Sequence, residues 1–280
     1  MDPIILDRKE PLMDLYAFPP IAGLLDGAHA VLMALAGLLE PVIGIASAAA
    51  AVVLVTLLVR AALIPVGVSQ ARAEQTRSRL APKLAALQQK HRKNPERLQR
   101  ETMKLYGDEG TTPFAGCLPM LVQAPIVGVI YALFILPTIA GHPNALLEQT
   151  FFGVPLGSSL AGQIAAGTLT PGAMLVFGVV IAGIAVVGEL TRRAFTPPQA
   201  GSTSSRADAP SPAALPGAPV NPLAGPGAAR LLGAMQFITA VIAIFVPLAA
   251  ALYLFVTVAW TLGQRVLLRR RYPLFEARTA

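Results

Sequence analysis

Four long stretches without acidic or basic side chains limit what this chain can fold into. They run from residue 111 to 147, from 149 to 188, from 231 to 264, and from 41 to 71, the last interrupted only by Arg60. About 20 apolar residues in a helix cross a hydrocarbon core of roughly 30 Å. Because the chain is 54% hydrophobic and only 13% charged, we predict an all-α integral membrane protein rather than a soluble domain.

Five membrane spans fit into these stretches. Span one is predicted at 41–69, span two at 111–137, span three at 172–191, and spans four and five together at 230–268. The uncharged stretch from 231 to 264 would be about 51 Å long as one straight helix, which exceeds the thickness of the bilayer. Pro247 lies near its middle, and proline interrupts helices because it lacks the backbone donor. A tight hairpin of two short spans is therefore predicted there.

The distribution of Lys and Arg predicts the orientation. Ten of these residues lie between Arg72 and Lys104, whereas the segment 138–171 contains none. Cytoplasmic segments of membrane proteins carry the excess of Lys and Arg. We therefore predict a multi-pass protein of the bacterial plasma membrane with its N-terminus outside, 138–171 as an outer loop and its C-terminus in the cytoplasm. The cytoplasmic segments are 70–110, 192–229 and the basic tail 269–280.

This orientation requires that the N-terminal segment 1–40 does not cross the membrane. Its apolar residues recur at helical spacing, whereas Asp26 and His29 lie off that stripe. An interfacial amphipathic helix on the outer face is therefore predicted in preference to an extra span. No cleaved signal peptide is expected, because the first 20 residues lack a continuous apolar core. The stripe consists of Ile21, Leu24, Leu25, Ala28, Val31, Leu32, Leu35, Leu38 and Leu39.

Two different structures are predicted for the longer cytoplasmic segments. The segment 70–110 has an apolar seam of leucines, and Asn94 followed by Pro95 is typical of a helix start. We predict a helical hairpin there. The segment 192–229 is dense in Pro, Gly, Ala and Ser and is predicted to be a disordered linker.

Arg60 is the candidate functional residue that the sequence singles out. It lies about nine residues, or about 13 Å, from the predicted end of span one, and a charge at that depth costs roughly 2.5–3.5 kcal/mol. No Asp or Glu lies inside a predicted span, so Arg60 is predicted to face a hydrated groove. The uncharged polar side chains available to that groove are Gln123, Gln236, Thr239 and Thr257.

Simpler explanations exist for these polar residues. Arg60 could extend its long side chain to the headgroups, and the glutamines and threonines could form ordinary hydrogen bonds between helices. The sequence has one cysteine, Cys117, and its three histidines lie far apart. These residues do not have the spacing of a metal site or of a catalytic site. We therefore predict a protein that is not an enzyme and uses neither cofactor nor metal.

Three segments of the chain resemble the YidC/Oxa/Alb family of membrane protein insertases. Asn94–Phe134 reads NPERLQRETMKLYGDEGTTPFAGCLPMLVQAPIVGVIYALF and resembles a hairpin helix that continues through a Gly-Cys-Leu-Pro turn, here with Cys117 and Pro119, into a span. Thr56–Gln70 reads TLLVRAALIPVGVSQ and resembles the first core span with its arginine. Phe245–Gln264 reads FVPLAAALYLFVTVAWTLGQ and resembles the last span, matching among others at Pro247, Tyr253, Trp260 and Gln264.

The resemblance implies five transmembrane helices around a hydrophilic groove, with Arg60 as the groove arginine, in a bacterial protein of actinobacterial type. It implies an insertase and chaperone for nascent membrane proteins in the lipid bilayer. Recognition of the ribosome, a targeting receptor or lipid headgroups is expected at the hairpin, where Arg92, Lys93 and Arg97 are candidates, although the orientation rule alone also explains these charges. The Sec translocon is a further candidate partner. No nucleic acid is expected beyond ribosomal contact. A small transporter or channel, or an assembly scaffold, are the alternatives.

Overall fold

The computed structural model describes residues 18–91, 94–110, 128–139, 141–195 and 237–273. The chain divides into two compact units, which are described one at a time. The first unit comprises Met1–Ala61, Val122–Gly183 and Ala240–Thr257, and the second comprises Ala62–Leu121, Ile184–Thr239 and Val258–Ala280.

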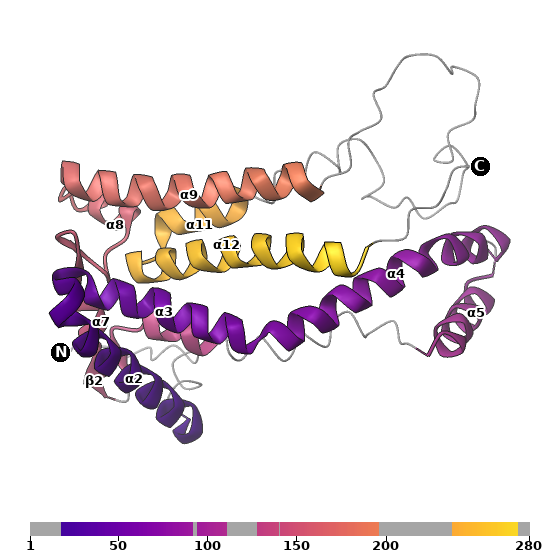
Figure 1. The fold of residues 1–280 in the computed structure, drawn as a ribbon, viewed down its shortest axis with the longest axis horizontal. Helices are drawn as coiled ribbons and strands as arrows, with labels where there is room; N and C mark the ends of the chain where they lie inside the picture. Colours follow the sequence, from indigo (N-terminus) through magenta and orange to yellow (C-terminus); the bar gives the residue numbers. More distant parts are fainter. Residues whose placement is uncertain (1–17, 92–93, 111–127, 140, 196–236, 274–280) are drawn as a thin grey trace, which may run out of the picture. The chain divides into compact units, whose positions relative to one another are not determined.

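The first unit begins with two helices, α2 (Pro19–Ile43) and α3 (Ser47–Ala62), joined by the short 3-10 helix η1 (Gly44–Ala46). Figure 1 shows the chain turning back at η1, from which α2 and α3 diverge. Gly44 makes this turn possible, since its φ of 64° is a conformation that residues with a Cβ rarely adopt. The backbone N–H of Gly44 donates to the carbonyl of Glu40 and ends α2.

The predicted amphipathic stripe of α2 is wider than the face that the structure buries. Leu25, Leu32 and Ala36 are buried along one side of the helix. Leu24 and Leu38, which belong to the same predicted stripe, are 58% and 74% exposed. Helix α2 therefore presents apolar side chains both to the unit and to its surroundings, which is typical of a helix in contact with lipid.

The predicted outer loop contains four short β-strands, which the predicted all-α class did not include. Strands β1 (Thr138–Ile139) and β2 (His142–Pro143) form one antiparallel pair, and β3 (Thr150–Phe151) and β4 (Val154–Pro155) form another. Phe152 and Gly153 connect β3 to β4 with φ values of 48° and 78°, as a tight hairpin turn requires. Two short helices lie in the same loop, α7 (Ala145–Glu148) and α8 (Leu160–Ala165).

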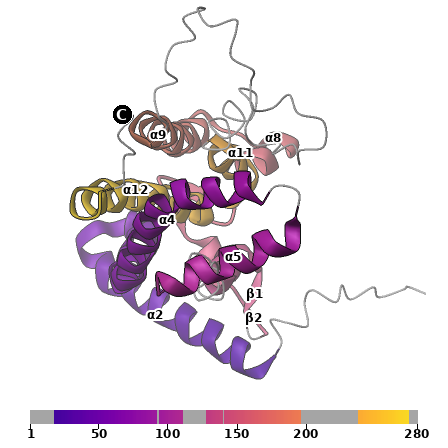
Figure 2. The same cartoon turned by 90° about the vertical axis from the view of Figure 1, so that its right-hand side faces the viewer.

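Three helices follow the loop: α9 (Pro171–Phe195), α11 (Ile238–Phe245) and α12 (Leu248–Arg271). Figure 2 shows α11 beside α9. Helix α11 ends and α12 begins on either side of Pro247, the residue at which we expected an interruption. The first residues of α12, from Leu248 to Tyr253, are all buried in the first unit.

The loop 138–171 supplies the hydrogen-bond acceptors for the start of α12. The backbone N–H of Leu248 donates to the carbonyl of Ser158 at 2.9 Å, and that of Ala249 donates to the carbonyl of Leu156 at 3.0 Å. The first N–H groups of a helix have no partner within the helix. These two contacts therefore satisfy buried donors and fix where α12 begins.

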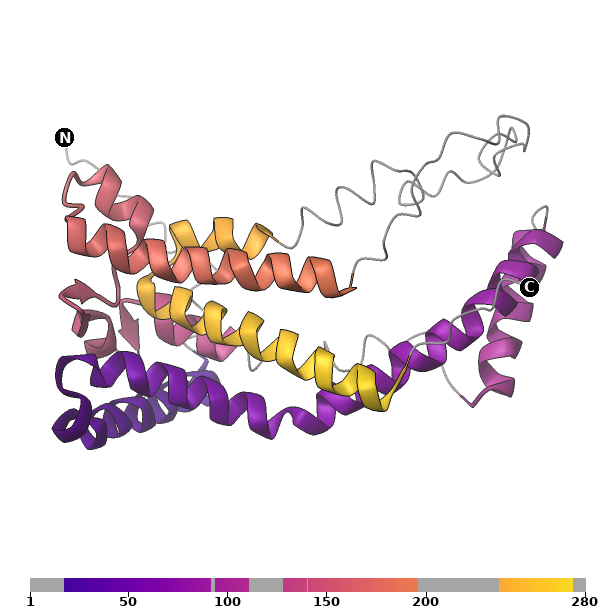
Figure 3. The same ribbon diagram turned by 45° about the horizontal axis from the view of Figure 1, so that its top comes forward.

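The second unit contains the predicted helical hairpin. Helix α4 (Ile64–Lys90) is followed by α5 (Pro95–Asp108), which folds back along the end of α4 (Figure 3). The side chain of Asn94 accepts a hydrogen bond from the N–H of Arg97 at 3.0 Å, and Pro95 occupies the first turn of α5. Within these two helices only Leu80 is buried, so the hairpin buries little apolar surface.

Helix α3 does not continue unbroken into α4, although the predicted span one, 41–69, assumed that it would. The helices are separated at Leu63. Pro65 lies in the first turn of α4, and it has no N–H to donate to the carbonyl of Ala61. The proline therefore accounts for the interruption.

Three stretches among the described residues are long and apolar enough to cross a membrane. They are Pro19–Ala62, which joins α2, η1 and α3, together with Pro171–Phe195 and Leu248–Arg271. The described chain is thus that of a mostly helical membrane protein. Much of predicted span two, including residues 111–127, and the start of span four lie outside the described residues, so the total of five spans stays a prediction. Most of the predicted linker, 196–229, also lies outside them.

Candidate functional site

An apolar pocket in the first unit lies along one face of α3. Its volume is about 390 Å³, and all nine side chains that line it are apolar. Six of them come from η1 and α3 at intervals of one and three residues, as expected for one helical face. The other three come from the end of α2, from β3 and from α12. The lining residues are Ile43, Ala46, Ala49, Ala50, Val53, Leu54, Leu57, Phe151 and Leu252.

Arg60 continues the pocket-lining face of α3. It follows Leu57 by three residues, which places it about 4.5 Å further along the same side of the helix. Its side chain is half-buried, and no hydrogen bond or ion pair connects it to another of the described residues. The apolar face of α3 therefore ends at the positive charge of Arg60, which has no partner among the described residues.

The end of α3 contributes a small compensation for this charge. Arg60 lies in the last turn of α3, where carbonyl groups without helical partners give the helix end a partial negative charge. A cation at that position gains about 0.3–1 kcal/mol, against a cost of roughly 2.5–3.5 kcal/mol for a charge deep in a membrane. At the predicted depth of Arg60 the helix end alone does not offset this cost, which agrees with the prediction that Arg60 faces a hydrated groove.

The structure describes only part of the predicted polar groove. Thr257 on α12 belongs to the first unit together with Arg60, and its hydroxyl oxygen is buried. Thr239 on α11 belongs to the second unit, and Gln123 and Gln236 lie outside the described residues. A groove formed by these side chains therefore stays a prediction.

Sequence reasoning missed the apolar part of this site. The spacing from Ala46 to Leu57 was available as a signal, because it repeats every three or four residues. Phe151 and Leu252 gave no such signal, since they lie far from α3 in the sequence. Thr56 is a further polar residue of α3, but its hydroxyl donates to the carbonyl of Val52 at 2.6 Å, which satisfies it locally.

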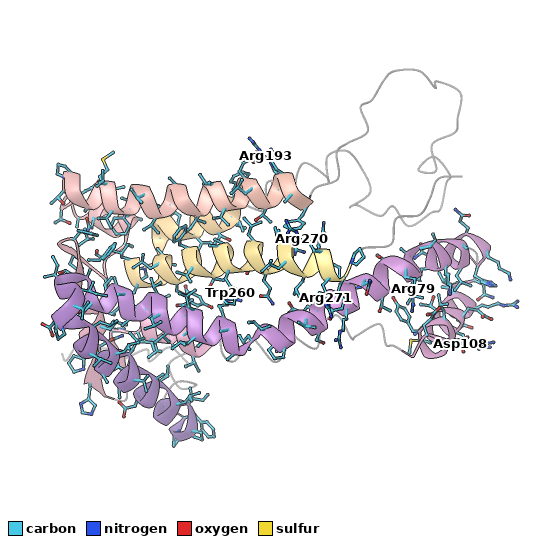
Figure 4. All side chains as sticks on the ribbon, in the orientation of Figure 1. Arg79, Asp108, Arg193, Trp260, Arg270 and Arg271 are labelled. Carbon is cyan, nitrogen blue, oxygen red and sulfur yellow. The ribbon has the colours of Figure 1, made fainter. Side chains whose placement is uncertain are left out.

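Of the family-matched residues, Tyr253 and Gln264 contact other helices, whereas Trp260 forms a hydrogen bond within α12. The ring of Tyr253 on α12 is buried and lies 6.0 Å from that of Phe134, measured between centroids. In the second unit, the Nε1–H of Trp260 donates to Oε1 of Gln264 at 3.0 Å; Figure 4 shows Trp260 on α12. Gln264 in turn lies against Gly67 of α4, where a Cβ would be 1.6 Å from its Nε2.

The remaining family-matched residues fall at the break between helices or outside the described chain. Pro247 separates α11 from α12. Cys117 and Pro119 lie outside the described residues, so the predicted Gly-Cys-Leu-Pro turn stays untested.

The hairpin has a second, charged groove between α4 and α5. It has a volume of about 440 Å³, and Figure 4 shows Arg79 and Asp108 on its two helices. Of the predicted recognition residues, Arg97 is exposed at the start of α5, whereas Arg92 and Lys93 lie outside the described residues. The groove is lined by Lys83, Ala86, Leu87, Lys90, Glu101, Lys104, Leu105 and Asp108.

Glu109 holds the open ends of the hairpin together. It accepts hydrogen bonds from Lys83 at 2.5 Å and from Arg79 at 2.8 Å. The hydrogen bond from Lys83 is the main cause that lowers the pKa of Glu109 below 4.5, with further attraction from Lys83 and Arg79. These pairs are exposed to solvent on the cationic side, so each contributes little to stability by itself.

Comparisons with known proteins agree with the membrane character of the chain. The family model described as "60Kd inner membrane protein" matches residues 38–275. The membrane protein insertase YidC of Clostridium perfringens is 44% identical over 81 residues, which is 29% of this chain and 34% of that protein. The membrane protein insertase YidC of Oceanobacillus iheyensis is 39% identical over 97 residues, 33% of this chain and 38% of that protein.

A plant protein shows similarity of the same kind. The chloroplastic inner membrane protein ALBINO3 of Arabidopsis thaliana is 37% identical over 106 residues, 38% of this chain and 22% of that protein. The chain therefore spans well under half the length of the relatives it matches.

Proposed function

This chain belongs to the 60Kd inner membrane protein family, and we propose that it is a membrane protein insertase and chaperone of the bacterial plasma membrane. The names of its relatives support this function. The structural observation that carries the proposal is the apolar face of α3 that ends at the half-buried Arg60. The actinobacterial subtype stays a prediction from resemblance.

The proposed substrate is a nascent membrane protein segment with an apolar part and a polar or acidic flank. The apolar part contacts the pocket beside α3, while the flank is attracted to Arg60 and to the hydrated groove predicted from Gln123, Gln236, Thr239 and Thr257. The segment then leaves sideways into lipid. The mechanism requires neither nucleotide nor metal, because each step exchanges one non-covalent contact for another.

The strengths of these contacts suit transient capture. Two unit charges at 4 Å attract each other by about 4 kcal/mol at an effective dielectric constant of 20. The apolar pocket adds orientation more than affinity, since lipid tails are as apolar as the pocket itself. A substrate segment is thus held by its charged flank and released when the flank has crossed.

Photocrosslinking tests whether substrates use the pocket. A photoreactive residue in place of Leu57 is expected to crosslink to the apolar segment of a nascent membrane protein. Leu38 is the matched control, because it is 74% exposed on α2 and lies outside the pocket. Equal crosslinking from both positions would show that substrates do not select this face of α3.

Variants of Arg60 test whether its positive charge attracts acidic segments of a client protein. Arg60→Ala should impair insertion most for a client with an acidic translocated tail and least for the same client with a neutral tail. Arg60→Lys should retain much of the activity, because a point charge suffices where no bidentate fork is required. Arg270→Ala is the control, since Arg270 is exposed at the end of α12.

Two outcomes would contradict this role. Equal loss for both tails at normal protein abundance would show that Arg60 shapes or hydrates the site without reading charge. Reduced abundance of Arg60→Ala would show that Arg60 has a structural partner, since removing an unpaired charge from a membrane relieves a cost.

The hairpin is proposed as the contact site for the ribosome, the Sec translocon or a targeting receptor. Its charged groove between α4 and α5 and the exposed Arg97 support this assignment. The proposed topology places this hairpin in the cytoplasm, with the N-terminus outside and the C-terminus inside.

A further inference from the structure

In the second unit, two arginines of α12 lie over one aromatic ring of α9. The guanidinium carbon of Arg265 is 5.3 Å from the ring centroid of Phe195, and that of Arg269 is 4.3 Å away. Both distances lie within the range of a cation–π attraction, about 6 Å. Since the two arginines are one helical turn apart, the ring holds two like charges close together.

One carboxylate, that of Glu74, faces the two guanidinium groups of Arg265 and Arg269, so the cluster keeps a net positive charge. Glu74 of α4 is the carboxylate shared by both arginines, at 3.9 Å from Arg265 and 3.7 Å from Arg269. These distances exceed the roughly 2.7–2.9 Å of a charge-assisted hydrogen bond. Two residues before Glu74, Arg72 donates to the hydroxyl of Tyr272 at 3.3 and 3.4 Å, so this arginine supplies no negative charge to the cluster either.

One donor of this cluster has no acceptor. The Nε of Arg269 is buried and has no hydrogen-bond partner among the described residues. Buried polar groups in folded proteins are nearly always hydrogen-bonded, and an exception points to an ion or ligand that belongs there. The missing partner has to be an acceptor, and the two guanidinium groups beside it favour an anion.

The position along α12 indicates where this anion comes from. Arg265 follows Leu248, the first residue of α12, by about 26 Å along the helix axis. A hydrocarbon core is roughly 30 Å thick, so a helix that crosses it places Arg265 and Arg269 at the level of the lipid headgroups. The abundant anions at that level are lipid phosphates.

We propose that Arg265 and Arg269, held against the ring of Phe195, form a binding site for the phosphate of an anionic phospholipid. The planar guanidinium group matches two phosphate oxygens at once. Glu74 keeps the two arginines in place without occupying their hydrogen-bond donors. The site is independent of the insertase function, because it lies in the second unit and needs no client protein.

Lipid binding to the purified full-length chain tests this site. Phosphatidylglycerol and phosphatidylcholine are titrated onto the detergent-solubilised protein, and bound lipid is counted by native mass spectrometry. Arg265→Gln/Arg269→Gln should weaken phosphatidylglycerol binding about tenfold or more, because charge-assisted hydrogen bonds are lost. Phosphatidylcholine binding should not change. Thermal unfolding of each variant verifies that it is folded.

Two variants separate a specific site from general attraction. Arg270→Gln/Arg271→Gln removes the same charge from the same end of α12, where Figure 4 shows both residues, and should weaken phosphatidylglycerol binding about twofold or less. Arg265→Lys/Arg269→Lys keeps the charge but removes the planar fork and should bind at an intermediate strength.

The proposal fails on either of two results. Equal loss in the two glutamine double variants would show that phosphatidylglycerol responds to the overall charge of the helix end. Unchanged binding in folded Arg265→Gln/Arg269→Gln would show that the lipid phosphate does not use these arginines.

Discussion

Individual glycines determine how closely helices approach within each unit. A Cβ at Gly183 of α9 would lie 2.8 Å from Cε2 of Phe255 on α12, and this contact is part of the first unit. Carbon atoms in contact are normally about 3.5–4.0 Å apart. The ring of Phe255 therefore occupies the space that a side chain at position 183 would need.

Gly183→Ala is expected to destabilise the protein by about 1–3 kcal/mol, the usual cost of overpacking a well-filled interior. Gly178→Ala on the same helix is the control, since a Cβ there would have no atom within 4 Å. Thermal unfolding of the two variants in the same detergent measures the difference. Equal unfolding temperatures would show that the ring of Phe255 moves aside without cost.

At the scale of secondary-structure elements, the hairpin of α4 and α5 combines little apolar burial with a pair of charged contacts at its open end. Glu109 accepts hydrogen bonds from two cations of α4, and these hydrogen bonds lower its pKa below 4.5. A carboxylate whose pKa is lowered in the folded state contributes stability above its unfolded pKa. That contribution is lost as the pH falls through the folded pKa.

Acidification is therefore expected to open the hairpin. Spin labels at Ala86 and Lys104, on the two sides of the charged groove, should move apart when the pH is lowered from neutral to about 3.5. Glu109→Gln should show the wider separation already at neutral pH and respond less to acid. Glu101→Gln is the control and should behave as the unchanged protein. An acid response that persists in full in Glu109→Gln would assign the titration to another group.

Local signals explain which elements the sequence predicted. Asn94 and Pro95 determine the start of α5 through their own backbone and side-chain chemistry, so this start is readable from two residues. Pro247 acts in the same way between α11 and α12. The predicted span one does not contain the interruption at Leu63, because the uncharged stretch is long enough for one span and outweighs the signal of Pro65.

Contacts between distant residues explain what the sequence did not predict. The pocket joins Leu57, Phe151 and Leu252, which no local pattern connects. The paired strands of the predicted outer loop are two residues long, too short for an alternating pattern to be seen. Arg60 was identified because a single charge in an apolar stretch is a local signal, but its position at the end of an apolar face needed the structure.

At the scale of the whole molecule, the arrangement across the membrane is the central untested property. The absence of Lys and Arg from 138–171 predicts that this segment lies outside. Asn144 is a poor place for a probe, because it is buried and its side chain donates to the carbonyls of Leu133 and Leu136. Gln149 is exposed in the same loop and is the better position.

Cysteine labelling tests this arrangement. In a variant whose single native cysteine is removed by Cys117→Ser, Gln149→Cys should react with an impermeant thiol reagent added to intact cells. Gln199→Cys, in the predicted cytoplasmic linker, should react only after the cells are opened. The reverse pattern would overturn the predicted orientation.

The hydrogen bonds at the start of α12 have a consequence for how the chain itself is made. The carbonyls of Leu156 and Ser158 are synthesised about ninety residues before the N–H groups of Leu248 and Ala249 that they receive. Because a ribosome synthesises the chain from its N-terminus, the acceptor carbonyls are already present in the nascent chain before the last helix emerges. The two buried N–H groups of α12 can therefore pair with their acceptors only near the end of synthesis, so this contact is among the last that the growing chain can form.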